Sequence, residues 1–452
     1  MSDNQDSANS LFLNTSPARL FFLAALPGAI SMLASSLYGL LDGIFVGQSL
    51  GETAFAALNL AFPFVVINFS LADLIGVGSS VPISISLGMK KEKEANNVFT
   101  CAVLMIVFAG ILIGALLYTI APFLIGMLGA EGELASYAVQ YMRVYAICSP
   151  LTTIIFAMDN YLRICGRIKM SMWLNIFMSF LTGVLEFLFL FIFRWGIWGA
   201  ALATCTGMMV CACIALFPFL RGNLQLKFCR PSFSWGLMKK IVACGSPNFL
   251  NNIAGRITSI IMNTVLLRTG GESAVTIYGI LMYVGETVQP LLYGVCDSLQ
   301  PAVGYNWGAG RPDRVQAIER YCFTAGAVIS IAASIIMLLF PAPLISLFAD
   351  SSDPVFMEQA ILAMRLFSTG YLTRWFSFAS QSYMLAVERP VSASIISVST
   401  ALIFPVILIV LLMPLGLNGI WLNQPVTCLL AAILAAFVMK KFRHDLNSGS
   451  CM

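Results

Sequence analysis

Long apolar runs separated by short polar segments make up most of this chain of 452 residues. The runs do not alternate between apolar and polar positions, as the strands of a membrane β-barrel do, and they reach the length of about 20 residues that an α-helix needs to cross a bilayer. We therefore predict an all-α membrane protein with twelve transmembrane helices, at about 20–47, 54–86, 97–126, 134–159, 168–193, 196–220, 239–267, 274–305, 318–348, 355–386, 391–413 and 418–440. The composition agrees, because 59% of the residues are hydrophobic and 10% are charged, whereas about 25% are charged in globular proteins.

The positions of Lys and Arg predict the orientation of these helices. If both termini are cytoplasmic, the inner segments hold nineteen Lys and Arg residues and the outer loops hold only Arg194 and Arg268. Cytoplasmic loops of membrane proteins carry such an excess. We therefore expect a multi-pass protein of the cell membrane with both termini in the cytoplasm. The net charge of +4 follows from this excess and indicates no nucleic acid partner.

Several kinds of enzyme chemistry are excluded by residues that the chain lacks. His444 is the only histidine and lies in the polar C-terminal tail, so neither a Ser-His-Asp relay nor a histidine-based metal site can form within the membrane. No Gly-Lys dipeptide occurs, which excludes the phosphate-binding loop of an ATPase. We expect no enzyme activity and no cofactor, which leaves transport, lipid handling or a non-transporting role.

The two halves of the chain repeat one another. Pro27 matches Pro247, GETA at 51–54 matches GESA at 271–274, and Gly88 matches Gly308, all at one and the same separation along the sequence. Six helices are thus followed by six similar ones in the same orientation, which predicts two six-helix bundles related by a pseudo-two-fold axis along the membrane normal. We predict a cytoplasmic N-terminal tail, an N-terminal bundle, a cytoplasmic linker, a C-terminal bundle and a cytoplasmic tail at 1–19, 20–220, 221–238, 239–440 and 441–452.

Acidic residues lie inside the predicted helices of the first half. These are Asp42, Asp73 and Glu186, and Arg143 is the only base among them. A charge at mid-membrane costs about 2.5–3.5 kcal/mol, so such residues face the bundle interior and often bind or relay ions. Acids held close together cannot all ionise, so they take up protons or hold a cation. The fifth helix adds a polar face at helical spacing, formed by Asn175, Ser179, Thr182 and Glu186.

The second half has a different distribution of charge. Span 7 carries a polar face with Asn252 and Arg256, and span 8 carries one with Glu286, Tyr293 and Asp297. Arg256 and Arg374 can neutralise Glu286 and Asp297, which favours a paired network. Such a network either holds the fold or binds polar groups of a substrate. We therefore place ion coupling in the first half.

Four motifs resemble those of a known family. They are SLQPAVGYNWGAGRPDRV (298–315), NYLRICGRIKMSM (160–172), GAALAT (199–204) and GLNGIWLNQP (416–425). They are similar to the signatures of the multidrug and toxic compound extrusion (MATE) family, in particular its bacterial DinF/MepA-type branch. The resemblance implies a twelve-helix antiporter that exports organic cations or other amphipathic compounds in exchange for H+ or Na+.

The resemblance also implies a coupling-ion site. An Asp on the first helix, an Asn and an Asp four residues apart on the fifth, and a Thr on the sixth correspond to Asp42, Thr182, Glu186 and Thr204. Two of the four residues differ from the family's pattern: Glu186 is longer by a methylene, and Thr182 has a hydroxyl in place of an amide. Proton exchange tolerates these changes better than a Na+ shell, which favours H+, although Na+ at Asp42 and Glu186 remains open.

Other readings of these residues stay open from the sequence. Asp42, Glu186, Thr182 and Thr204 can serve only as interhelical hydrogen-bonding groups, and Asp73 either lines the same cavity or caps a helix break near Gly76. At the level of function, a flippase for a lipid-linked precursor and a non-transporting receptor or scaffold are the alternatives. We expect the partners to be the lipid bilayer and a small amphipathic or cationic substrate, with the chain working as a monomer.

Overall fold

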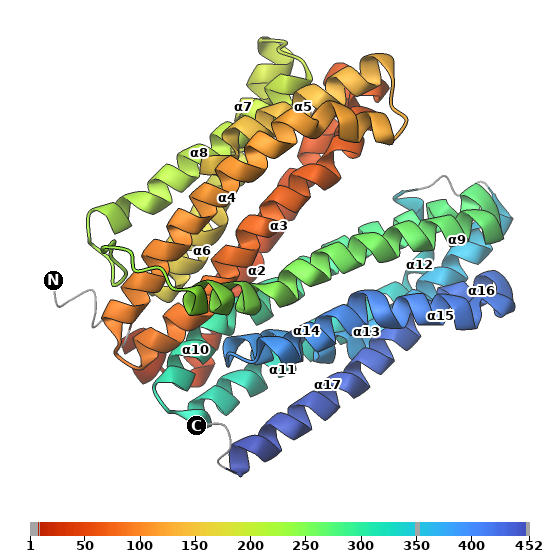
Figure 1. Cartoon of the computed structure of the whole chain (residues 1–452). Helices are drawn as coiled ribbons and strands as arrows, with labels where there is room; N and C mark the ends of the chain where they lie inside the picture. Colours follow the sequence, from red (N-terminus) through yellow and green to blue (C-terminus); the bar gives the residue numbers. More distant parts are fainter. Residues whose placement is uncertain (1–7, 9, 349–352, 449–452) are drawn as a thin grey trace. The chain divides into compact units, whose positions relative to one another are not determined.

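The computed structural model describes residue 8, residues 10–348 and residues 353–448. These residues are almost entirely helical and contain no strand (Figure 1). The helices of the first half are α2 (Pro17–Leu50), α3 (Glu52–Gly88), α4 (Glu92–Met127), α5 (Gly132–Thr152), α6 (Ile154–Ile164), α7 (Ile168–Phe187) and α8 (Ile197–Leu220). Those of the second half are α9 (Trp235–Cys296), α10 (Gln300–Gly308), α11 (Pro312–Leu339), α12 (Pro341–Ser346), α13 (Pro354–Ala386), α14 (Pro390–Val398), α15 (Phe404–Leu412), α16 (Gly416–Trp421) and α17 (Asn423–Asn447). Short π-helical segments lie at Ser10–Asn14, Leu188–Ile192 and Ser399–Ile403, and 3-10 turns at Asp297–Leu299 and Met413–Leu415.

The prediction of twelve helical spans is confirmed. Nine segments of the described chain are long and apolar enough to cross a membrane, six in the first half and three in the second. The other three predicted spans lie in α9 and α13. Although α9 extends over Trp235–Cys296, its backbone is not helical at Gly271, so it comprises two helices that correspond to predicted spans 7 and 8. The long helix α13 corresponds to span 10.

Glycines at repeated positions end helices in the same way in both halves. Gly51 (φ 82°) separates α2 from α3, and Gly271 (φ 68°), its counterpart in the repeat, separates the two arms of α9. Gly196 (φ 73°) and Gly416 (φ 68°) form a second such pair. Glycine adopts this left-handed conformation without the steric penalty of a side chain. The repeat therefore extends to the backbone of the turns.

Contacts divide the chain into two compact units. The first unit is Met1–Gly245 with Gly304–Pro312, and the second unit is Ser246–Val303 with Asp313–Met452. The division falls inside α9. The predicted linker, 221–238, covers the segment between α8 and α9 and the first residues of α9. The predicted bundle limits of 20–220 and 239–440 stay predictions. Of the predicted tails, residues 1–7, 9 and 449–452 lie outside the described residues.

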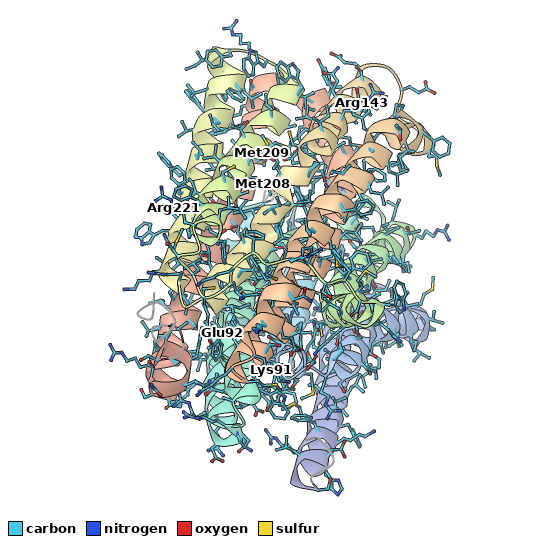
Figure 2. The ribbon with its side chains drawn as sticks, turned by 60° about the vertical axis from the view of Figure 1, so that its left-hand side comes forward. Lys91, Glu92, Arg143, Met208, Met209 and Arg221 are labelled. Atoms are coloured by element: carbon cyan, nitrogen blue, oxygen red, sulfur yellow. The ribbon has the colours of Figure 1, made fainter. Side chains whose placement is uncertain are left out.

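Apolar helices and small residues hold the first unit together. In it, α4 packs against α3 and α5, α2 against α7, and α8 against α5 and α7. A Cβ atom at Gly114 of α4 would lie 2.4 Å from the carbonyl oxygen of Ala146 in α5, so only glycine permits this approach. Figure 2 shows Arg143 near one end of this unit and Lys91 and Glu92 near the other, with Met208 between them. The charged side chains thus flank an apolar middle, as the predicted spans require.

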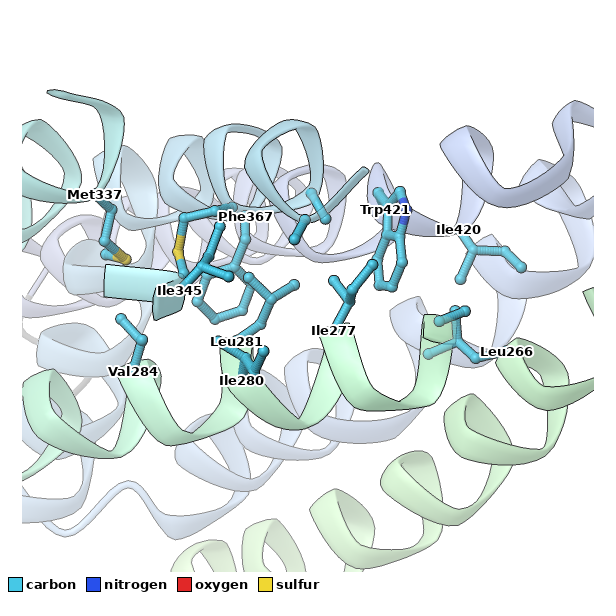
Figure 3. Close-up of a cluster of buried hydrophobic side chains, with 14 of the residues drawn as sticks. Leu266, Ile277, Ile280, Leu281, Val284, Met337, Ile345, Phe367, Ile420 and Trp421 are labelled. Atoms are coloured by element: carbon cyan, nitrogen blue, oxygen red, sulfur yellow. The ribbon is translucent and has the colours of Figure 1, made fainter. Parts of the chain in front are cut away.

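An aliphatic and aromatic cluster forms the core of the second unit. Leu266 and Ile277 of α9, Phe367 of α13 and Trp421 of α16 pack together and are each at most 5% exposed (Figure 3). Hydroxyl groups tie α11 to α13, since Ser330 Oγ donates to the Tyr371 carbonyl oxygen at 2.7 Å. The neighbouring helix α17 packs against α13 and α15. This packing positions α9, α13 and α17 around the cavity described below.

Candidate functional site

The two carboxyl groups of Asp42 and Glu186 meet inside the first unit. Asp42 lies on α2 and is 9% exposed, and Glu186 lies on α7 and is fully buried. Their carboxyl groups lie close enough to interact directly with each other. Asp42 Oδ1 and both Glu186 oxygens have no donor group from the described residues. A contact between two acceptor groups becomes a hydrogen bond only when one of them holds a proton, so the pair is built to share a proton or a cation.

Hydroxyl groups of α2, α5 and α8 lie near this acidic pair. Tyr38 lies one helical turn before Asp42 on α2, and its hydroxyl is 2.7 Å from Thr204 Oγ1 of α8. On the neighbouring helix α5, the buried Tyr141 hydroxyl donates to that of Tyr145 at 3.4 Å. The sequence analysis did not include these tyrosines. The spacing of four residues from Tyr38 to Asp42 was the available signal, because it places both side chains on one face of a helix.

Close packing of α7 against α8 sets the position of Thr182. This residue is 1% exposed and lies one turn before Glu186. Its hydroxyl donates to the Met178 carbonyl oxygen at 2.7 Å in its own helix. A Cβ atom at Gly207 of α8 would lie 2.2 Å from Thr182 Oγ1, so the missing side chain of Gly207 lets the two helices approach. Thr182 therefore packs against α8 at Gly207, which lies three residues after Thr204 on that helix.

The polar face predicted on α7 belongs to two separate networks. Asn175 Nδ2 donates to Asp159 Oδ1 at 2.8 Å and contacts Ser31 Oγ at 3.4 Å, away from Glu186. Asp159 in turn forms an ion pair with Arg163 at 2.7 Å, in which both side chains are largely buried. The sequence analysis did not include Asp159, although its spacing of four residues from Arg163 was a signal. Asp159 is thus an intramembrane acid with a cation beside it, unlike Asp42 and Glu186.

Asp73 lies on another helix than the acidic pair. It is half-buried on α3, which contributes no residue to the contacts among Asp42, Glu186, Tyr38 and Thr204 described above. The structure therefore brings Asp42, Glu186 and Thr204 together by way of Tyr38, with Thr182 in the adjacent turn, and it bonds Asn175 to Asp159. The part of Asp73 in the site stays a prediction.

A polar cavity of about 210 Å³ lies in the second unit. Tyr293 of α9 and Arg374 of α13 line it, together with residues of Ser399–Ile403, α15 and α17. Arg374 Nη2 donates to Gln289 Oε1 at 2.7 Å. Among the residues that the structure describes, Arg374 forms no ion pair with Glu286 or Asp297, which differs from the pairing that the sequence suggested.

The other predicted polar residues of the second unit do not line this cavity. Asp297 accepts hydrogen bonds from Gln300 Nε2 and Ser382 Oγ, both at 2.9 Å. The side chains of Asn252, Arg256 and Glu286 are exposed and do not line the cavity. Helical spacing correctly placed these residues along α9, but one face of a helix is wide enough to serve more than one neighbour. The expected single network is therefore divided.

A group of three or more His, Cys, Asp or Glu residues able to hold a metal ion is absent from the described part of the chain. The carboxyl oxygens of Asp42 and Glu186 are the acidic ligands that the first unit places together. Two carboxyl groups with nearby hydroxyls offer a site for a proton or a monovalent cation.

Comparisons with known proteins agree with this architecture. The MatE family model matches residues 27–188 and again residues 247–411. The two matches begin at Pro27 and Pro247, which the sequence analysis had paired, and this confirms the internal repeat. Among curated proteins, the chain is similar to the multidrug export protein MepA of Staphylococcus aureus (strain MSSA476), with 26% identity over 428 residues and 92% of each chain covered. It is also similar to MepA of Staphylococcus haemolyticus, with 23% identity over 427 residues, which cover 94% of this chain and 93% of the relative.

Solved structures share the fold over nearly the whole length. A MOP superfamily transporter from Pyrococcus furiosus superposes with a TM-score of 0.90 at 23% identity, covering 98% of both chains. The outward-facing conformation of a multidrug resistance MATE family transporter superposes with a TM-score of 0.89, also at 23% identity, covering 97% of both chains. These similarities identify the two-lobe membrane fold of such transporters.

Proposed function

The chain belongs to the MatE family of multi-span membrane transporters, and from this premise we propose that it exports small amphipathic or cationic molecules in exchange for H+ or Na+. The proposed coupling site is the acidic pair Asp42 and Glu186, with Thr204, Tyr38 and Thr182 around it. We further propose that the protein works as a monomer in the cell membrane with both termini cytoplasmic. The curated relatives named as multidrug export proteins support the direction and the breadth of transport.

The observation that carries this proposal is the contact between two buried carboxyl groups that have no basic partner beside them. Two negative charges in direct contact in a low dielectric repel strongly, so the pair is stable when it holds one proton or one cation. An ion that binds here more tightly in one conformation than in the other shifts the equilibrium between the two conformations. Release and uptake of this ion on opposite sides of the membrane would then drive the transport cycle.

The geometry favours H+ over Na+ as the coupling ion. A fixed Na+ shell needs several oxygen ligands at set distances, whereas a proton needs only one acceptor pair. The Thr182 hydroxyl donates to its own helix, and the hydroxyls of Tyr38 and Thr204 bond to each other. These bonds leave lone pairs on the hydroxyl oxygens, so the support for H+ comes from the two carboxyl groups, which one shared proton joins in a hydrogen bond.

The proposal is tested by dye transport in proteoliposomes made with the purified protein. Proteoliposomes that contain wild type or Asp42→Asn are loaded with a fluorescent cationic dye. Efflux of the dye is followed under an imposed proton gradient or, separately, a sodium gradient. We expect gradient-driven efflux in wild type and none in Asp42→Asn. Glu94→Gln is the matched control, because Glu94 is an exposed acid of α4 whose side chain is 53% exposed.

Two results would contradict the proposal. If Asp42→Asn matches wild type, coupling does not depend on the acidic pair. If wild type moves the dye under neither gradient, ion-coupled export of cations is wrong for this chain, and the same liposomes with a labelled lipid then test the flippase alternative.

A further inference from the structure

The cavity of the second unit differs from the acidic site in the sign of its charge. Among the described residues that line it, Arg374 is the one with a formal charge. The cavity volume of about 210 Å³ is smaller than the roughly 300–1,000 Å³ of a site that encloses a whole drug-sized molecule. It is large enough for one end of such a molecule.

The guanidinium of Arg374 is only partly satisfied by the protein. Its Nη2 atom donates to the amide oxygen of Gln289 at 2.7 Å, and its Cζ lies 5.6 Å from the centre of the Tyr371 ring. Among the described residues, no carboxylate lies within ion-pair distance of it. A guanidinium has five N–H donors in a planar fork that matches a carboxylate with two hydrogen bonds. Arg374 is therefore a partly buried cation with no ion-pair partner among the described residues, and Glu286 interacts with it only from beyond ion-pair distance.

Neutral amides and an aromatic pair complete the lining. Asn251 and Gln381 both line the cavity, and neither amide bonds to another group of the described residues. Gln381 lies two turns after Arg374 on α13 and is 7% exposed. The rings of Tyr293 and Phe378 meet edge to face with centres 4.7 Å apart and form an apolar wall. Donors for an anion thus lie next to a surface for an aromatic or aliphatic group.

We propose that this cavity is a carboxylate-binding subsite, and that Arg374 makes the protein accept molecules that carry a carboxylate beside an aromatic or apolar part. The substrates would then include organic anions and zwitterions in addition to cations. The inference rests on the proposed function for its role in transport, but it makes a claim about binding that can be tested without transport.

The test compares two fluorescent probes that differ in one group. Dansylglycine carries a carboxylate, and dansylglycinamide carries a neutral amide of almost the same size. Binding of each is measured by dansyl fluorescence with the full-length protein in lipid nanodiscs. We expect wild type to bind the acid about tenfold or more tightly than the amide, because a bidentate pair of a guanidinium with a carboxylate is among the strongest hydrogen-bonded contacts.

Four variants locate the source of this preference. Arg374→Gln should bind the acid and the amide equally, whereas Arg374→Lys should keep part of the preference because it keeps the charge. Gln289→Glu keeps Arg374 but gives it a carboxylate partner at the position of its present acceptor, so it should also lose the preference. A purely structural role of Arg374 predicts no loss in Gln289→Glu. The control is Arg256→Gln, which removes an exposed arginine of the same unit outside the cavity.

Other outcomes overturn the inference. They are equal binding of acid and amide by wild type, binding of neither probe, or an unchanged preference in folded Arg374→Gln and Gln289→Glu, with folding checked by thermal unfolding of each variant. These failures are distinct from a failure of the proposed function. Selective binding of the acid without gradient-driven dye efflux would support the carboxylate subsite and contradict ion-coupled export. Dye efflux without selective binding of the acid would support ion-coupled export and contradict the subsite.

Discussion

The acidic pair of the first unit and the arginine cavity of the second unit occupy repeated halves of one chain, yet they carry opposite charge. Asp42 corresponds to Met262 in the register that matches Pro27 with Pro247, and Met262 is 6% exposed in the apolar core of the second unit. Arg365 follows Arg143 by 222 residues, two more than the separation of Pro27 and Pro247, and in this second register Arg374 corresponds to Thr152, which is fully buried. The two halves share the arrangement of their helices, but they do not share the polar and charged residues at matching positions. Each half can therefore bind a different partner: an ion in the first, and a group of the substrate in the second.

The largest expected effect comes from Glu186→Gln. Removing the second carboxyl of the pair should abolish gradient-driven dye efflux in proteoliposomes. The remaining carboxyl group has no second acid with which to share a proton or a cation, so the site no longer binds the coupling ion. The same variant should bind dansylglycine like wild type, since Glu186 lies in the other unit from Arg374. A changed acid preference in Glu186→Gln would show that the two sites are coupled, and the separation drawn above would be wrong.

Asp159→Ala tests the contrast between paired and unpaired acids within the first unit. It leaves the buried guanidinium of Arg163 without its ion-pair partner, which should lower the free energy of unfolding by about 3–5 kcal/mol. Chemical denaturation in detergent measures this. Asp42→Asn is the matched comparison, and it should leave stability equal to wild type or higher because it removes one of two contacting acids. Equal destabilisation by both substitutions would contradict the distinction.

Gly207→Ala tests how the first unit positions its polar groups. The new Cβ atom would lie 2.2 Å from Thr182 Oγ1, so the Thr182 side chain must rotate away from its bond to Met178 or α7 and α8 must move apart. We expect a loss of about 1–3 kcal/mol and weaker ion coupling. Gly183→Ala on α7 is the control, because its Cβ atom meets no other atom within 4 Å. Thermal unfolding and dye efflux are measured for both. If Gly207→Ala behaves like Gly183→Ala, the close approach of the helices is not needed for the site.

Tyr38→Phe should have a smaller effect. It removes the hydroxyl that bonds to Thr204, a contact of about 1 kcal/mol, and should slow ion-driven efflux about fivefold without abolishing it. Tyr137→Phe is a suitable control, since that exposed hydroxyl bonds to Glu133 in its own helix. Complete loss of coupling in Tyr38→Phe would instead place the tyrosine at the ion itself.

The smallest effect is expected for Arg374→Gln in transport of the cationic dye. A dye without a carboxylate does not use the guanidinium, so its proton-driven efflux should stay within about twofold of wild type. A severe loss would show that the arginine cavity is needed for every substrate, and the assignment of separate roles to the two units would fail.

The sequence by itself determined the helical class, the twelve spans and the repeat. These follow from local properties, because the length of an apolar run and the spacing of matching residues do not depend on how helices pack. It also identified Asp42 and Glu186 as acids that must avoid lipid, since the cost of a charge in hydrocarbon is a property of the residue. Helical periodicity placed Thr182 and Glu186 on one face of α7.

Only the tertiary structure decided which faces meet. A polar face of a helix can contact several neighbours, and the one that it contacts depends on packing between segments far apart in the chain. Thr182 of α7 packs closely against Gly207 of α8. Asn175, on the same face of α7, instead donates a hydrogen bond to Asp159 of α6. Arg374 likewise donates to Gln289 rather than pairing with Glu286, because the packing of α13 against α9 brings the amide and not the acid within reach. Charge and periodicity limit the partners of a buried group, and the packing of the helices chooses among them.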